Sequence, residues 1–168
     1  MALIPLGGKA AAGRAAIVDD TMAAELLRQR WYCGYGRAAR SVNYRTPDGR
    51  WTARTIFMHR EVLRLAGIEV PAGCETDHIN GDRLDNRLAN LRVVTHQQNG
   101  WNRKIELTKR SSKYKGVYRH KTTWQAGIRH NGKQIYLGCY TDEWDAAQAY
   151  NEAARRLFGE YASPNMRD

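Results

Sequence analysis

The sequence has few of the features that mark a secreted or membrane-bound protein. It has three cysteines in 168 residues, and they lie far apart at Cys33, Cys74 and Cys139. This spacing offers no Cys-x-x-Cys zinc site, and the odd number argues against a disulfide framework. No apolar run approaches the length of a membrane span, and glycines interrupt the N-terminal segment where a signal peptide would be continuously apolar. We therefore expect a cytoplasmic protein with no membrane partner.

Acidic residues are also scarce relative to basic ones. Lys and Arg number 27 against 17 Asp and Glu, which gives a formal net charge of +10. Such a charge favours a polyanionic partner over a neutral or acidic one, although a basic surface can also serve solubility. The 42% hydrophobic content is enough for a folded core, but two modules would each have a modest one.

The pattern of strands and helices predicts an α+β fold in four parts. Residues 1–57 read as a β-rich supporting region, with a helix over "DDTMAAELLRQRW" that is capped by Asp19 or Asp20 and carries Trp31 on its apolar side. A hairpin is expected around "TPDG". We assign no chemistry to this region beyond support and contact with DNA. The other three parts are expected to be a module at 58–103, a basic linker at 104–112 and a second module at 113–166.

The segment "TDHINGDRLDNRLANLRVVTHQQNGWN", residues 76–102, is the richest in polar chemistry. It reads as a strand ending at Asp77-His78, a turn at Asn80-Gly81, a second strand and a short helix capped by Thr95. Such a β-β-α hairpin sets the end of its first strand against the helix, so Asp77 and His78 are expected to face Asn99.

These side chains match the requirements of phosphodiester hydrolysis. A histidine can deprotonate water near neutral pH, which suggests His78 as the general base. A hard cation that neutralises the phosphate prefers oxygen ligands, which Asp77 and Asn99 would supply. We expect one Mg²⁺ or Mn²⁺ ion per active site.

The stretch "DHINGDRLDNRLANLRVVTHQQN" resembles the HNH endonuclease motif in the version found in phage and intron homing endonucleases. The resemblance implies that His78 is the base, Asp77 and Asn99 are metal ligands, and Asn90 is a clamp across the hairpin loop. His96 stays an alternative to Asn99, because it lies three residues earlier and can share the same helix face.

The C-terminal part has a clear strand pattern around the hairpin signal Asn131-Gly132. Three strands and an amphipathic helix are expected, with Thr141 as N-cap and Gly159 just past the helix end. Pairing across the hairpin puts Ile128 opposite Ile135, Ala126 opposite Leu137, and Trp124 opposite Cys139, all on one apolar face. The opposite face collects Gln125, Gly127, Arg129, Gln134 and Tyr136, which suits a DNA-reading surface because strand ribbons can enter the major groove.

Residues 111–166 resemble an AP2 DNA-binding domain, through a Gly-Val start, "AGIR", "YLG" and "AAQAYNEAA". The resemblance implies DNA contacts at Lys115, Tyr118, His120, Arg129, Gln134 and Tyr136. Tyr118, Gly127 and Gln134 depart from the plant pattern, so the plant target sequence is not expected to carry over.

These features together predict an HNH homing endonuclease, with an AP2-like module that positions it on double-stranded DNA. We expect a monomer that nicks one strand and has no small-molecule substrate. The main rival is a catalytically inactive HNH/AP2 regulator that binds specific DNA sites. An RNA-binding or recombination accessory protein is a weaker alternative.

Overall fold

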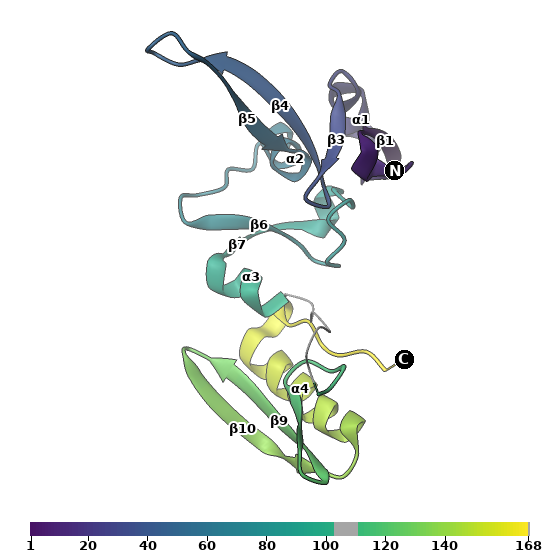
Figure 1. Cartoon of the computed structure of the whole chain (residues 1–168), viewed down its shortest axis with the longest axis vertical. Helices are drawn as coiled ribbons and strands as arrows, with labels where there is room; N and C mark the ends of the chain where they lie inside the picture. Colours follow the sequence, from purple (N-terminus) through teal and green to yellow (C-terminus); the bar gives the residue numbers. More distant parts are fainter. Residues whose placement is uncertain (103–110, 168) are drawn as a thin grey trace. The chain divides into compact units, whose positions relative to one another are not determined.

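The computed structural model describes residues 1–102 and 111–167, and it divides the chain into two compact units, Met1–His96 and Gln97–Asp168 (Figure 1). Most of the linker predicted at 104–112 lies outside the described residues. No helix within the described part is long and apolar enough to cross a membrane.

The first unit is built on a five-stranded sheet with the order β2-β1-β3-β4-β5. Its strands are β1 (Ala2–Gly7), β2 (Ala15–Val18), β3 (Trp31–Gly34), β4 (Arg37–Arg45) and β5 (Trp51–Phe57). β1 and β3 run parallel and the other neighbours antiparallel. The hairpin predicted around "TPDG" is confirmed as β4–β5, where Arg45 pairs with Trp51.

Two helices complete this part of the chain, α1 (Asp20–Leu27) and α2 (Met58–Leu65), with a short 3-10 helix at Lys9–Ala11. The prediction that Trp31 belongs to the first helix is wrong. The helix ends at Leu27, and Trp31 begins β3, where its indole Nε1 donates to the Leu26 carbonyl at 2.8 Å. Trp31 therefore packs against the helix from a neighbouring strand, and its bulky side chain suits that position.

One hydrophobic core joins the sheet to the segments that follow it. Ile4, Val18 and Leu26 are almost fully buried together with Met58 and Val62 of α2, and the same cluster includes Leu91. The division expected between residues 57 and 58 therefore falls inside a shared core. The N-terminal sheet is the platform on which the next segment folds.

That segment contains a two-stranded antiparallel sheet of β6 (Cys74–His78) and β7 (Leu91–Thr95), which is followed by α3 (His96–Asn102). Asp77 pairs with Arg92 and His78 with Leu91 across the two strands. A loop of polar residues joins β6 to β7 and ends in a 3-10 helix at Leu88–Asn90. The predicted order of strand, loop, strand and helix is confirmed.

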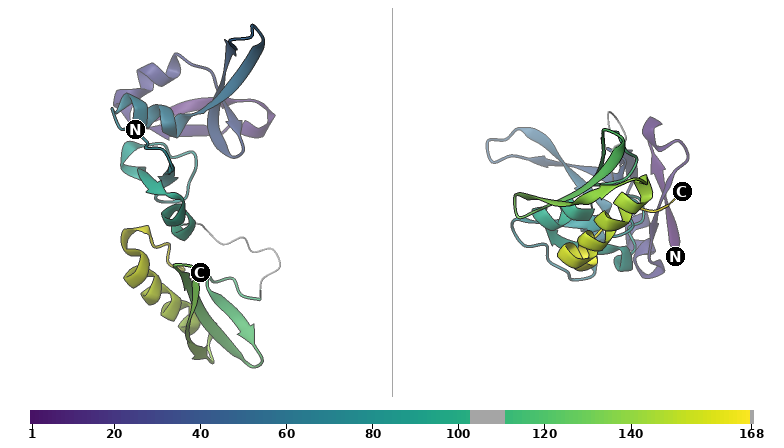
Figure 2. Two further views of the ribbon diagram at one scale, coloured as in Figure 1. Left: turned by 90° about the vertical axis from the view of Figure 1, so that its left-hand side faces the viewer. Right: turned by 90° about the horizontal axis from the view of Figure 1, so that it is seen from below.

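The C-terminal unit contains a three-stranded antiparallel sheet with the order β10-β9-β8. Its elements are β8 (Val117–His120), β9 (Thr123–His130), β10 (Lys133–Tyr140), α4 (Glu143–Phe158) and a 3-10 helix at Gly159–Tyr161. Helix α4 lies along one face of the sheet (Figure 2) and buries Ala146, Ala147 and Tyr150 there. Its N-cap is Asp142 rather than the predicted Thr141, because the Asp142 carboxylate accepts from the amides of residues 144 and 145. The predicted Gly159 is the C-cap.

The hairpin register is as predicted only up to Tyr136. Ile128 pairs with Ile135, but an irregularity between Tyr136 and Gly138 makes Ala126 pair with Gly138 and Trp124 with Tyr140. Gly138 has a φ of 127°, which a residue with a side chain rarely adopts. The extra residue is a β-bulge, so Cys139 moves to the exposed side of the sheet instead of its predicted apolar face.

Candidate active site and nucleic-acid face

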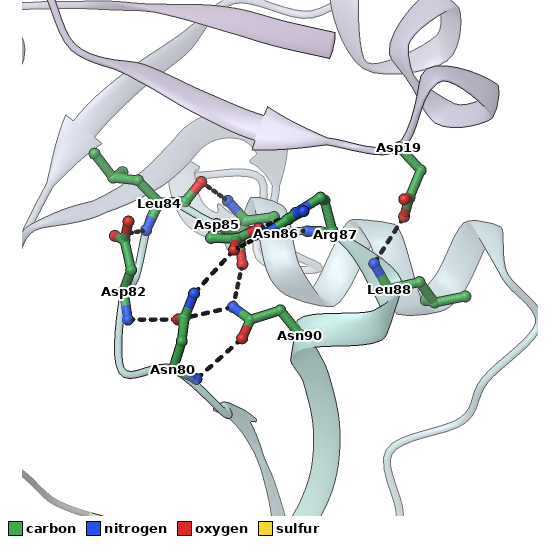
Figure 3. A network of polar contacts seen from close by, with 9 residues as sticks. All are labelled: Asp19, Asn80, Asp82, Leu84, Asp85, Asn86, Arg87, Leu88 and Asn90. Carbon is green, nitrogen blue, oxygen red and sulfur yellow. Dashed lines mark hydrogen bonds and ion pairs between the residues drawn. The ribbon is translucent and has the colours of Figure 1, made fainter. Parts of the chain in front are cut away.

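Asn90 ties together the loop between β6 and β7 (Figure 3). Its Nδ2 donates to Asn80 Oδ1 at 3.0 Å and to the Asp85 carbonyl at 2.8 Å, while its Oδ1 accepts from the Asn80 amide at 3.0 Å. Asn90 is buried, and both ends of its amide are therefore satisfied inside the loop. This geometry is that of the loop clamp which the resemblance implied.

Asp85 is the second organising residue of this loop. Arg87 binds its carboxylate with two contacts, Nε to Oδ1 at 2.8 Å and Nη2 to Oδ2 at 2.6 Å, and Asn80 Nδ2 donates to Oδ2 at 2.9 Å. These hydrogen bonds, with that from Arg87 first, hold the pKa of Asp85 below its usual value. Arg87 thus braces the loop.

The loop is also fixed to the N-terminal sheet. The Ile17 amide donates to the Leu84 carbonyl at 2.8 Å, and the Asn86 amide donates to the Ile17 carbonyl at 2.7 Å. Asp19 Oδ2 accepts from the Leu88 amide at 2.7 Å (Figure 3). The predicted cap residue Asp19 is the N-cap of α1 by position, but its side chain makes no capping hydrogen bond and serves this long-range contact instead.

His78 lies at the end of β6 and is 6% exposed. Its Nε2 lies 3.3 Å from Asn86 Oδ1, and Asn86 Nδ2 donates to the Leu84 carbonyl at 3.1 Å. With that amide orientation Oδ1 is an acceptor, so the neutral imidazole carries its hydrogen on Nε2 and its lone pair on Nδ1. Burial lowers the pKa of His78, and the hydrogen bond with Asn86 acts in the opposite direction. A buried, neutral and oriented imidazole is what a general base requires.

A second histidine lies against His78. The ring of His59 meets the ring of His78 edge-on at 5.3 Å, and its other neighbour is the Phe57 ring, stacked at 5.5 Å. Burial, followed by the charges of His78 and Arg37, lowers the pKa of His59 to about 3. His59 is therefore a packing residue, and it packs directly on the candidate base.

Asp77 is paired with its cross-strand neighbour Arg92. The Arg92 Nε and Nη2 lie 2.9 and 2.8 Å from Asp77 Oδ2, and both side chains are largely buried. Both contacts with Arg92 fall on Oδ2. The described residues contain no group of three His, Cys, Asp or Glu side chains that would hold a metal by themselves. Carboxylate and amide oxygens are the donor types that Mg²⁺ or Mn²⁺ prefers, and the roles of Asp77 and Asn99 as ligands stay predictions.

The two helix residues considered as ligands both lie in α3. His96 is exposed, and its Nδ1 lies 2.8 Å from Glu75 Oε1. Asn99 lies three residues further along the helix and is partly buried. Its metal-ligand role stays a prediction.

The C-terminal sheet brings four of the predicted DNA contacts onto one face. Tyr136 and Gln134 on β10 alternate with inward residues, Arg129 pairs with Gln134 across the hairpin, and Gln134 Nε2 donates to Tyr118 Oη at 3.1 Å. All four are exposed. The side chains of Gln134 and Tyr118 lie over Gly127, where a Cβ would be only 2.6 Å from Gln134 Nε2. The outward polar face derived from strand alternation is therefore present in this unit.

The other three predicted contacts, His120, Gln125 and Lys115, differ in how exposed their side chains are. His120 is exposed at the end of β8, and Gln125 is partly buried in β9 opposite Tyr118. The Lys115 side chain is directed inward, where its Nζ donates to the Trp101 carbonyl at 2.6 Å. Burial lowers the pKa of Lys115 to about 8. A DNA contact by Lys115 stays a prediction.

Sequence reasoning missed two residues around His78, Asn86 and Arg37, and the contact that His59 makes with it. Asn86 lies in the predicted Asn/Asp-rich loop, but nothing in the spacing distinguishes it from its neighbours. Arg37 lies on β4, and its charge lowers the pKa of both histidines. Only the fold brings residue 37 near residue 78, so no local sequence signal pointed to it.

Comparison with known proteins agrees with this geometry. Residues 57–101 match the family model described as HNH endonuclease. The chain is 37% identical over 144 residues to an uncharacterized HNH endonuclease, L560, of Acanthamoeba polyphaga mimivirus, covering 84% of this chain and 69% of that relative. It is also 32% identical over 78 residues to Protein 3.8 of Escherichia phage T7, with 45% of this chain and 64% of the relative covered.

A segment of the chain is similar to plant proteins. It is 44% identical over 63 residues to the AP2-like ethylene-responsive transcription factor At2g41710 of Arabidopsis thaliana, which covers 30% of this chain and only 15% of that protein. The similarity therefore concerns one small module of a much longer relative.

Proposed function

The chain belongs to the HNH endonuclease family, and we propose that it hydrolyses a phosphodiester bond of double-stranded DNA with the help of one divalent cation. The observation that carries this proposal is the state of His78. It is buried, oriented by Asn86 and set at the edge of a loop clamped by Asn90. The hydrogen bond with Asn86 sets the tautomer that a base acting through Nδ1 requires.

In this proposal His78 Nδ1 takes a proton from the attacking water. Asn86 holds Nε2–H, so the ring presents its lone pair without having to change tautomer. The lowered pKa of His78 keeps the ring unprotonated at neutral pH, when it must act as a base. The clamp of Asn90 on Asn80 and Asp85 keeps the strand end in place during the reaction.

Asp77 would hold the cation through its carboxylate, with Asn99 as the second ligand assigned by the resemblance. A bound Mg²⁺ or Mn²⁺ supplies charge that stabilises the leaving oxygen. Arg92 fixes the direction of the Asp77 carboxylate from the neighbouring strand.

The AP2-like face would select the site on duplex DNA. Arg129 and Gln134 offer side chains that hydrogen-bond base edges, while Tyr118 and Tyr136 offer flat apolar surface beside them. The net charge of +10 supports binding to the DNA backbone. We propose that this single-site enzyme acts as a monomer and nicks one strand.

A DNA-binding regulator without catalysis is the second candidate, and one observation favours it. Asp77, the only carboxylate assigned to the cation, is already paired with Arg92. If that pairing persists on DNA, the protein would bind its site and leave the backbone intact.

Supercoiled plasmid separates the two candidates. The proposed nuclease converts it to the relaxed form in Mg²⁺ or Mn²⁺ and is stopped by EDTA, whereas the regulator retards the plasmid on a gel without relaxing it. His78→Ala should bind DNA like the wild type and fail to cut. Equal cutting by His78→Ala would remove His78 from the role of base.

A further inference from the structure

Arg37 is connected to the candidate base by an unbroken line of side-chain contacts. Its guanidinium carbon lies 5.6 Å from the centre of the Phe57 ring. Phe57 stacks on His59 at 5.5 Å, and His59 meets His78 at 5.3 Å. Arg37, a residue of the N-terminal sheet, is therefore linked to the candidate base through Phe57 and His59.

Two further arginines, on different elements, act on Arg37 through their charges. Arg60 is exposed on α2 and Arg83 is exposed in the loop between β6 and β7. Burial is the largest cause that lowers the pKa of Arg37. The charge of Arg83 is the next largest, and the charge of Arg60 acts in the same direction. Glu75 opposes them, but this carboxylate already contacts His96. Arg83 and Arg60 thus act on Arg37 from two other segments and Glu75 opposes them, while the carboxylates of Asp77 and Asp82 act on the neighbouring His78.

These arginines differ from Arg87 and Arg92, the arginines that brace the β6–β7 loop and the Asp77 carboxylate, in what they bind. Arg87 and Arg92 each hold a carboxylate through two nitrogens. Within residues 1–102 and 111–167, Arg37, Arg60 and Arg83 make no ion pair and no side-chain hydrogen bond. Crowding unpaired cations costs free energy in the unbound protein, and an anion bound among them would recover it.

Two buried polar atoms point to the same conclusion. Arg37 Nε and His59 Nδ1 are both buried without a hydrogen-bond partner in the described part of the chain. The His59 residue as a whole is only 5% exposed. Buried donors and acceptors of this kind are normally satisfied, and an unsatisfied pair beside a candidate base calls for a ligand. A neutral imidazole and a guanidinium both offer N–H donors to an anion.

We propose that Arg37, Arg60 and Arg83, backed by His59, form a binding site for a phosphate group of the DNA backbone beside His78. An arginine fork matches the oxygens of a phosphate better than a lysine does, which fits the presence of three arginines here. The inference deepens the proposed function, because it names the groups that would hold the cleaved strand against the base. It also gives the N-terminal sheet, to which the sequence assigned no chemistry, a direct part in substrate binding.

The experiment uses the full chain and two kinds of measurement. The first follows the ring ¹⁵N–¹H signals of His59 by NMR while inorganic phosphate is added, which requires no nuclease activity. The second measures binding of a duplex oligonucleotide in EDTA over a range of salt concentrations. Both are made on wild type, Arg37→Ala, Arg37→Lys and the control Arg14→Ala. Arg14 is exposed in the turn before β2, and its charge is absent from those that shift the pKa of Arg37, His59 or His78 in the described structure.

The proposal predicts that phosphate shifts the His59 signals in wild type and Arg14→Ala but not in Arg37→Ala. Arg37→Ala should bind the duplex about tenfold more weakly, and its plot of log affinity against log salt should be shallower by about 0.9. Arg37→Lys should keep the wild-type slope, because it keeps the charge, while its affinity falls. Arg37→Ala loses no ion pair but does lose the contact with the Phe57 ring, so the urea midpoint of each variant is measured and binding is compared under conditions in which all of them are folded, which excludes misfolding as the cause.

The two hypotheses fail in different ways. Phosphate binding by a protein that cuts no DNA would end the proposed function and leave this inference standing. If the protein cuts DNA but Arg37→Ala matches Arg14→Ala in salt slope and affinity, the inference is overturned and the nuclease remains. Phosphate binding that is lost in Arg37→Ala, without any change in duplex binding, would also overturn it, since the site would then serve a free anion.

Discussion

Replacing Asn90 with alanine should unfold the loop that carries the candidate active site. The change removes three hydrogen bonds, two to Asn80 and one to the Asp85 carbonyl. At about 1 kcal/mol each they contribute about 3 kcal/mol to the free energy of unfolding. The Asp85 carbonyl would also be left without this buried partner, which adds a cost of about 1–3 kcal/mol unless water reaches it.

The assay is urea denaturation of Asn90→Ala, together with amide hydrogen exchange at Asn80. The control is Asn43→Ala on β4, the same substitution at an exposed asparagine whose side chain makes no hydrogen bond among the described residues. We expect a loss of roughly 3–6 kcal/mol for Asn90→Ala, less than about 0.5 kcal/mol for the control, and faster exchange of the Asn80 amide. A loss no larger than that of Asn43→Ala, with the Asn80 amide still protected, would refute the clamp.

Three other predictions follow from the described contacts. Asn86→Ala should lower the cleavage rate of DNA by roughly 10–100-fold with little change in DNA affinity, because His78 loses the partner that fixes its tautomer; an unchanged rate in single-turnover assays would show that Asn86 does not orient the base. His59→Phe should make the free energy of unfolding less sensitive to acid. In the folded chain the pKa of His59 is about 3, whereas the unfolded histidine binds a proton below about 6.5. The free energy of unfolding of the wild type therefore falls as the pH drops between these values, by up to about 1.4 kcal/mol per pH unit. Urea midpoints at pH 7 and 4.5 that change equally in both proteins would contradict this. Arg129→Ala should weaken binding to the preferred site by roughly 1–3 kcal/mol while sparing random duplexes, and an equal loss on both would make Arg129 a phosphate contact.

Local chemistry made much of the fold predictable. Asn131-Gly132 set the β9–β10 hairpin and placed Ile128 opposite Ile135, because a two-residue turn fixes the register of the strands that it joins. The same reasoning failed beyond Tyr136, since a bulge depends on packing that strand alternation does not include. Trp31 followed the helical period of its neighbours, yet tertiary contacts drew it into β3.

The candidate site was predictable only where the segment 76–102 contains it. Asp77, His78 and Asn90 lie within that segment, and the structure describes contacts for each. Arg37 and Asp19 come from the N-terminal sheet region, far from this segment in the sequence, and their roles depend on the shared core that brings the sheet to the loop. No pattern within either segment specifies that contact.

The most direct measurement is relaxation of supercoiled plasmid by wild type and His78→Ala, each with Mg²⁺ or Mn²⁺ and each with EDTA. The central claim is that the His78 imidazole, oriented by Asn86, and one cation together cleave the DNA backbone. It predicts relaxation only for the wild type with metal, while His78→Ala retains its affinity for the same DNA. Relaxation that continues in His78→Ala, or a wild-type protein that binds DNA and leaves it intact in both metals, would contradict it.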